Sequence, residues 1–222
     1  MNDAKQEIIK RIVSMSGKYS PGTVFADWVE CSAIAIQNAY CMIHDSLWKK
    51  REEQYLAVLK KYEPKEQIQF SEMFGLLVKA FESEMTDILG EIYMESGCGS
   101  KQTGQFFTPF HLSVLTAEMA IKNKMINENE KYIITEPSAG GGGMIIAAAK
   151  VLKDRGIDYR SCMRVTAQDL DWRSVYMAYV QLSLLGISAT VIQGNALSKS
   201  YVQGKYPPEC VFMTPRKMGV VF

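Results

Sequence analysis

At residues 132–144 the chain carries the segment YIITEPSAGGGGM, in which an apolar run reaches Glu136 and is soon followed by four glycines. The run 131–135 predicts a buried strand, and residues 144–152 predict a helix. Glycines at such a junction permit positive φ values and let a ligand approach the backbone, and the first N–H groups of the helix are free to bind it. The junction therefore predicts a ligand-binding loop; a flexible connector is the alternative interpretation.

The spacing of the glycines narrows the class of ligand. A dinucleotide-binding loop requires the pattern G-x-G-x-x-G or G-x-G-x-x-A. Counted from Gly140, the last position of that pattern falls on Ile145. Counted from Gly141, it falls on Ile146, so the dinucleotide interpretation fails. An acidic residue followed by a short glycine-rich turn suits a ligand with a cationic amino acid part and no pyrophosphate, and S-adenosylmethionine is such a ligand.

The residues after the glycines alternate between strand and helix patterns, which predicts βαβ units and a parallel sheet. The expected elements are strands at 164–168, 189–193 and 210–213, with a helix at 174–185. Asp169 ends the second strand, where a carboxylate typically accepts hydrogen bonds from ribose hydroxyls. Asp171 is expected to cap the following helix. Asn195 follows the third strand and either faces an adenine ring or forms a turn.

A second motif, GQFFTP, occupies residues 104–109, upstream of the glycines. Thr108 is expected to be the N-cap of a helix and Pro109 its first residue. Two aromatic residues, Phe106 and Phe107, stand directly before this cap. They are candidates to pack against the adenine or to close the pocket.

The first hundred residues predict helices with apolar faces. One apolar stripe runs from Phe25 to Leu47, a further helix continues until Pro64, and another begins at about Ser71. The Gly/Ser-rich segment 96–101 predicts a domain boundary. We therefore expect a helical N-terminal domain at 1–100 and a cofactor-binding α/β domain at 101–222.

The amino-acid composition indicates which partners and which cellular compartment to expect. Net charge is +1, with 11 Lys and Arg against 15 Asp and Glu in residues 1–100, and 14 against 9 afterwards. This charge balance predicts that the isolated chain binds DNA only weakly. The five cysteines are widely spaced and there are two histidines, so we expect reduced thiols and no metal site. We also expect no membrane span and a cytoplasmic location.

Together the strings GQFFTP, EPSAGGGGM, QDLD and GNAL resemble the modification subunit of type I restriction-modification systems, over roughly residues 85–215. The resemblance implies an adenine-N6 DNA methyltransferase with a helical N-terminal region and a Rossmann-like, S-adenosylmethionine-binding sheet. It implies that Thr108 contacts the methionine carboxylate, that Asp169 holds the ribose and that Asn195 lies near the adenine. The predicted cofactor-binding residues are Phe107, Thr108, Glu136, Ser138, Ala139, Gly140, Gly142, Asp169 and Asn195.

The chain departs from the family at the expected catalytic tetrapeptide. Asn-Pro-Pro-Phe/Tyr is the family pattern after the fourth strand, and Met213-Thr214-Pro215-Arg216 stands in the corresponding place. In the family the Asn accepts hydrogen bonds from the attacking amine and the aromatic residue stacks on the flipped base. A thioether is a weak acceptor, so Met213 is a poor substitute.

The end of the chain at Phe222 predicts a partial sheet, truncated after its fourth strand and without a target-recognition domain. Three functions follow from these expectations. The chain is an adenine-N6 DNA methyltransferase, or an inactive S-adenosylmethionine-binding regulatory module, or a fragment that needs a second chain. The expected partner is a methyltransferase or specificity subunit.

Overall fold

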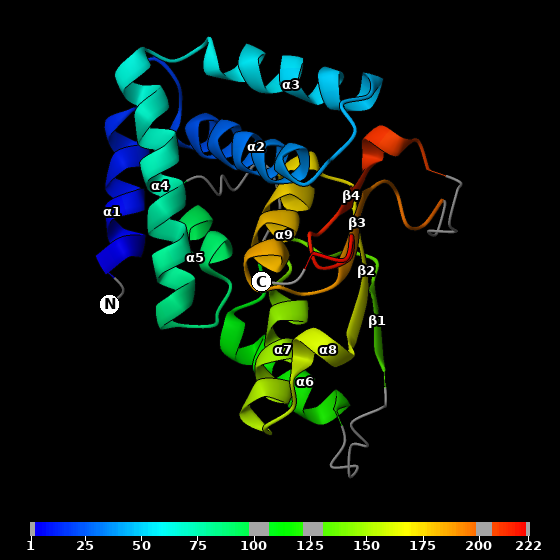
Figure 1. Cartoon of the computed structure of the whole chain (residues 1–222). Helices are drawn as coiled ribbons and strands as arrows, with labels where there is room; N and C mark the ends of the chain where they lie inside the picture. The colour runs from blue at the N-terminus through cyan, green and yellow to red at the C-terminus, as the bar shows by residue number, and fades with distance from the viewer. Residues whose placement is uncertain (1–2, 98–106, 122–130, 199–205, 221–222) are drawn as a thin grey trace. The chain divides into compact units, whose positions relative to one another are not determined.

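The computed structural model describes residues 3–97, 107–121, 131–198 and 206–220. The chain divides into two compact units (Figure 1). The first unit comprises residues 1–84 and 88–106, and the second comprises residues 85–87 and 107–222. In the described ranges, no helix is long and apolar enough to cross a membrane.

The described part of the first unit is helical, as the apolar stripes predict. Its elements are α1 (Asp3–Ser14), α2 (Pro21–Ala39), α3 (Ser46–Leu59), α4 (Pro64–Ser83) and α5 (Ile88–Glu95). Trp28 of α2 is fully buried and its indole N–H donates to the Phe70 carbonyl of α4, 3.1 Å away. The aromatic side chains of α2 and α5 meet at Phe25 and Tyr93, whose ring centroids lie 5.5 Å apart. Apolar burial and this indole bond therefore hold the helices together.

Two boundaries in the first unit differ from the expectation. The apolar stripe does not continue to Leu47, because α2 ends at Ala39 and Ile43 is 76% exposed. Asp45 caps a new helix there, its side chain accepting a hydrogen bond from the Trp48 N–H. Pro64 begins a helix instead of ending one, since proline lacks only an N–H that a first helical residue does not need.

The second unit contains the sheet, which has the order β1-β2-β3-β4. The strands are β1 (Tyr132–Glu136), β2 (Met163–Asp169), β3 (Ala189–Gln193) and β4 (Val211–Met213). The helices are α6 (Phe110–Ala120), α7 (Gly143–Asp154), α8 (Tyr159–Cys162) and α9 (Trp172–Leu184), with a 3-10 turn at Pro208–Cys210. Strands β1, β2 and β3 are parallel, as predicted. Helix α9 packs on β2 and β3 (Figure 1).

The first strand is not the buried strand that its apolar residues predict. Among the described residues β1 pairs with β2 alone, and Ile133 is 80% exposed. Residues on the other face, such as Ile134, are only partly covered. The apolar run is therefore an edge strand, because burial of a strand depends on neighbours that the local sequence does not specify.

The fourth strand runs antiparallel to β3, which corrects the prediction of a wholly parallel sheet. Met213 lies opposite Thr190 at the start of β3, and Val211 lies opposite Ile192 near its end. Phe212 anchors the strand, with 2% of its surface exposed and its ring 5.1 Å from that of Tyr179 on α9. The end of β4 consequently lies at the amino edge of the three parallel strands.

The cysteines of the described residues are free thiols. Cys31 and Cys162 are buried, whereas Cys41 and Cys210 are partly exposed, and Cys98 lies outside the described residues. Burial raises the pKa of the Cys31 and Cys162 thiols, so both are neutral at physiological pH. Among the residues that the structure describes, no group of three or more His, Cys, Asp or Glu side chains could hold a metal ion.

Candidate cofactor-binding site

The glycine loop connects β1 to α7 through a tight turn. Glu136 ends β1 and its side chain accepts a hydrogen bond from the Ser138 N–H at 3.3 Å. The Gly142 N–H donates to the Ala139 carbonyl at 2.8 Å. Gly140 has φ +51° and Gly142 has φ +92°, values at which a side chain would be strained. The turn therefore requires glycine at these two positions.

Asp169 joins the glycine loop to the end of the second strand. Its Oδ2 accepts a hydrogen bond from the Gly140 N–H at 2.8 Å, and its Oδ1 accepts one from the Asp171 N–H at 3.0 Å. The Ala139 N–H donates to the Gln168 carbonyl at 3.0 Å, which is a second hydrogen bond between the glycine loop and the end of β2. A carboxylate has about four acceptor sites, and these two bonds leave some for further donors. The carboxylate thus lies against the turn and still has capacity for a ligand's hydroxyl groups.

Asp171 is the N-cap of α9, which confirms its predicted role. Its side chain accepts a hydrogen bond from the Ser174 N–H at 3.4 Å. The two carboxylates of this segment therefore have separate functions: Asp171 starts the helix, whereas Asp169 holds the loop.

The described part of the GQFFTP motif lies next to the same turn. A Cβ atom built on Gly140 would lie 3.1 Å from Phe107 Cε1, so the Phe107 ring covers this glycine. Thr108 is exposed, and it is not the N-cap as predicted, because the helix begins one residue later with Pro109 in the cap position. Phe106 lies outside the described residues.

The third strand brings Asn195 and an unpredicted tyrosine to the same edge. Asn195 is exposed and its Oδ1 accepts a hydrogen bond from the Leu197 N–H at 2.9 Å, which is the turn that its residue type suggested. Tyr206 lies beside Gly194, where a built Cβ would be 2.5 Å from the tyrosine ring. The Tyr206 hydroxyl is bonded to Gln168 Nε2 at 2.6 Å. No local pattern marks Tyr206, because its contacts are with strands far away in sequence.

The residues at this edge belong to the part of the chain that matches a known family. The sequence model of N-6 DNA methylase matches residues 84–217, more than half of the chain. The chain belongs to the N-6 DNA methylase family. This match includes the glycine loop, Asp169 and Asn195.

Two solved structures align with most of the chain. A Listeria monocytogenes protein assigned as a class I S-adenosylmethionine-dependent methyltransferase aligns with a TM-score of 0.53 and 15% identity, over 91% of this chain and 56% of that protein. The methyltransferase subunit of a type I restriction-modification system from Streptococcus thermophilus aligns with a TM-score of 0.46 and 17% identity, over 87% of this chain and 43% of that protein. The first of these alignments shows that the chain has the α/β fold of class I methyltransferases. The chain spans about half the length of these two structures.

The predicted catalytic tetrapeptide lies away from the glycine loop. Residues 213–216 follow β4 and lie at the amino edge of the parallel strands, whereas the loop lies at their carboxyl edge. Thr214 is fully buried; its Oγ1 donates to the Ile187 carbonyl at 2.7 Å and accepts from the Ala189 N–H at 2.9 Å. The structure therefore does not bring the tetrapeptide together with the glycine loop, and its catalytic role stays a prediction. In this structure Thr214 attaches β4 to the start of β3.

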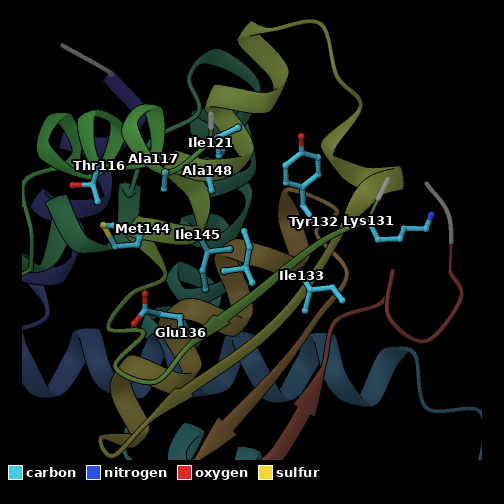
Figure 2. Close-up of a pocket in the computed structure, with 12 residues that line it drawn as sticks. Thr116, Ala117, Ile121, Lys131, Tyr132, Ile133, Glu136, Met144, Ile145 and Ala148 are labelled. Atoms are coloured by element: carbon cyan, nitrogen blue, oxygen red, sulfur yellow. The ribbon is translucent and has the colours of Figure 1, made fainter. Parts of the chain in front are cut away.

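A groove of about 590 Å³ is lined by β1 together with α6 and α7 (Figure 2). Glu136 and Met144 lie at one end of the groove and Lys131 at the other. Among the predicted cofactor-binding residues, Glu136 lines it; the residues of the turn and Asp169 do not. The groove and the glycine loop thus meet at the carboxyl end of β1.

Proposed function

We propose that the chain binds S-adenosylmethionine at the carboxyl edge of β1, β2 and β3. The observation that carries this proposal is the 2.8 Å hydrogen bond from the Gly140 N–H to Asp169 Oδ2. It brings the glycine turn and the acidic residue of the second strand together, although 28 residues separate them in the sequence. Binding at the carboxyl ends of parallel strands is the general behaviour of such sheets.

The residues at this edge suit the cofactor. Asp169 retains acceptor capacity for the two ribose hydroxyls, and the absence of a Cβ atom at Gly140 lets the Phe107 ring lie against the loop. In this proposal Phe107 covers the bound molecule, and Asn195 and Tyr206 form the wall at the end of β3. When bound, S-adenosylmethionine supplies a methyl group on a sulfonium centre that is open to displacement by an amine.

The family assignment extends the proposal to methyl transfer to adenine N6 in DNA. DNA and a specificity or second methyltransferase subunit are the proposed partners. Met213 and Arg216 lie at the opposite edge of the sheet, and this placement favours a second candidate function. In that candidate the chain is a cofactor-binding module that transfers methyl groups poorly unless another chain supplies the group that holds the adenine amine.

Calorimetric titration with S-adenosylmethionine tests the first part. We expect a dissociation constant in the micromolar range, which corresponds to a binding free energy of about −8 kcal/mol. No heat and no thermal shift at millimolar cofactor would contradict the proposed site.

Incubation of the purified chain with labelled cofactor and DNA of mixed sequence separates the two candidates. Weak or absent transfer to adenine supports the module. Robust transfer by the chain alone excludes it and establishes the methyltransferase.

A further inference from the structure

A buried carboxylate from a distant part of the sequence lies against the glycine loop. Asp87 stands between α4 and α5 in the sequence, yet residues 85–87 belong to the unit that contains the sheet. The residue is 4% exposed. A buried carboxylate is unfavourable unless hydrogen bonds compensate for the lost hydration, so its partners indicate its role.

Gln181 of α9 connects Asp87 to the loop. The Gln181 side chain has 0% exposure, and its Nε2 donates to Asp87 Oδ1 at 2.7 Å. The same Nε2 donates to the Gly141 carbonyl at 2.7 Å. One amide group therefore uses both of its hydrogens to join the carboxylate to the backbone of the loop.

Asp87 also explains why the loop contains four consecutive glycines. Gly140 and Gly142 have positive φ, but Gly141 and Gly143 do not, so their conformation does not require glycine. A Cβ atom built on Gly141 would lie 3.1 Å from Asp87 Oδ1. One built on Gly143 would lie 3.0 Å from Asp87 Oδ2. Two glycines therefore serve the turn, and the other two leave room for the carboxylate.

The carboxylate lies beside the first residue of α7, which is Gly143. The N-terminus of a helix carries partial positive charge, so a carboxylate there is favourable. The cap residue of α7 is Gly142, which has no side chain to provide this charge. Asp87 thus stabilises the end of the loop where the helix begins, and Gln181 stabilises the middle.

We propose that Asp87 is a positioning residue that, together with Gln181, holds the glycine loop in the conformation that binds the cofactor. This inference rests on the proposed cofactor site. A loop held in place before binding loses less conformational entropy when the ligand arrives, so the affinity is higher. Asp87 need not touch the ligand for this effect.

The test compares Asp87→Asn with Asp27→Asn. Asp27 is a second buried carboxylate, 6% exposed, bonded to Tyr62 and Lys61 in the first unit. Amide hydrogen exchange of the loop is measured without ligand, and the dissociation constant for S-adenosylmethionine is measured by calorimetry. We expect Asp87→Asn to speed exchange of residues 138–146 and to weaken binding about tenfold. Asp27→Asn should change global stability alone.

A double-mutant cycle tests the spatial argument. Gly143→Ala should speed exchange of the loop and weaken binding when Asp87 is present, because the new methyl group meets Oδ2. In an Asp87→Ala background the same change should have at most a twofold effect, because the oxygen is gone. If Asp87→Ala does not fold, Gln181→Met tests the connection from its other end. This variant keeps the Asp87 oxygens, removes both amide hydrogen bonds and should reproduce the faster exchange.

Unchanged loop exchange in Asp87→Asn, or equal effects of Gly143→Ala in both backgrounds, would overturn the positioning role. Failure of the proposed function gives a different result. If the wild-type chain does not bind S-adenosylmethionine, the exchange measurements still show whether Asp87 holds the loop, because they contain no ligand.

Discussion

The two edges of the sheet differ in what holds them. At the carboxyl edge, Asp169 accepts a hydrogen bond from the glycine loop, and the Gly194 N–H donates to the Asp169 carbonyl at 2.8 Å, so the ends of three strands are connected. At the amino edge, Thr214 attaches β4 to the start of β3. The comparison teaches that a polar residue after a strand can have different tasks: Asp169 holds a loop at the edge of the proposed site, whereas Thr214 attaches one strand to the next.

The largest expected effect is at Gly140. Gly140→Val should abolish measurable cofactor binding, a loss of at least about 100-fold, while the fold persists. At φ +51° a β-branched residue is strained, and its Cβ would press on Phe107. Titration with S-adenosylmethionine measures the loss.

Gly156→Val is the matched control for this change. Gly156 has φ +77° with nothing within 4 Å of a built Cβ, so the same strain arises away from the loop. It should lower the melting temperature and leave affinity unchanged. If Gly140→Val binds the cofactor with wild-type affinity, the loop is a flexible connector and not a binding loop.

Asp169→Ala should weaken cofactor binding by about 1.5–3 kcal/mol, the range for hydrogen bonds to a charged group. The variant loses both the ribose acceptor and the bond to the Gly140 N–H. Calorimetry measures the affinity, and Asp171→Ala is the control. That variant removes the cap of α9, with a stability cost of about 1 kcal/mol. If the two variants bind equally well, the wrong carboxylate has been assigned to the ribose.

Thr214→Val sharpens the contrast between the edges. The valine keeps the shape of the side chain but leaves the buried Ala189 N–H without its acceptor, at a cost of about 1–3 kcal/mol. We expect a lower melting temperature and an unchanged dissociation constant for the cofactor. A large loss of cofactor affinity without a loss of stability would show that Thr214 belongs to the binding site.

The smallest effect is expected from the double variant Met213→Asn, Arg216→Phe, which introduces family-like residues into the tetrapeptide. Because these positions lie at the amino edge, methyl transfer to DNA should stay within about twofold of the wild-type rate, less than 0.5 kcal/mol. The labelled-cofactor assay measures it. A gain of tenfold or more would show that β4 moves next to the site during the reaction.

Several features could be predicted from the sequence because their causes are local. The glycine loop is one: positive φ at Gly140 and Gly142 is a property of the residues themselves. The cap at Asp171 is another, since its partner Ser174 is three residues away. The helices of the first unit follow from their apolar spacing, although Asp45 and Pro64 changed where they begin.

Other features depend on contacts between residues far apart in the sequence. The apolar run of β1 predicted burial, and its place at an edge left Ile133 exposed. The direction of β4 follows from burial of Phe212 against α9 and from the bonds of Thr214 to the start of β3. Tyr206 and Asp87 reach the loop edge from segments that carry no motif.

By itself the sequence determined the type of fold, the glycine turn and the acidic residue that holds it, because local conformational preference and strand periodicity act within a few residues. The tertiary structure alone decided which strand β4 pairs with, and therefore that Met213 lies at the amino edge. It also decided that Gly141 and Gly143 leave room for Asp87. Pairing and packing bring together residues many positions apart, and no single segment contains that information.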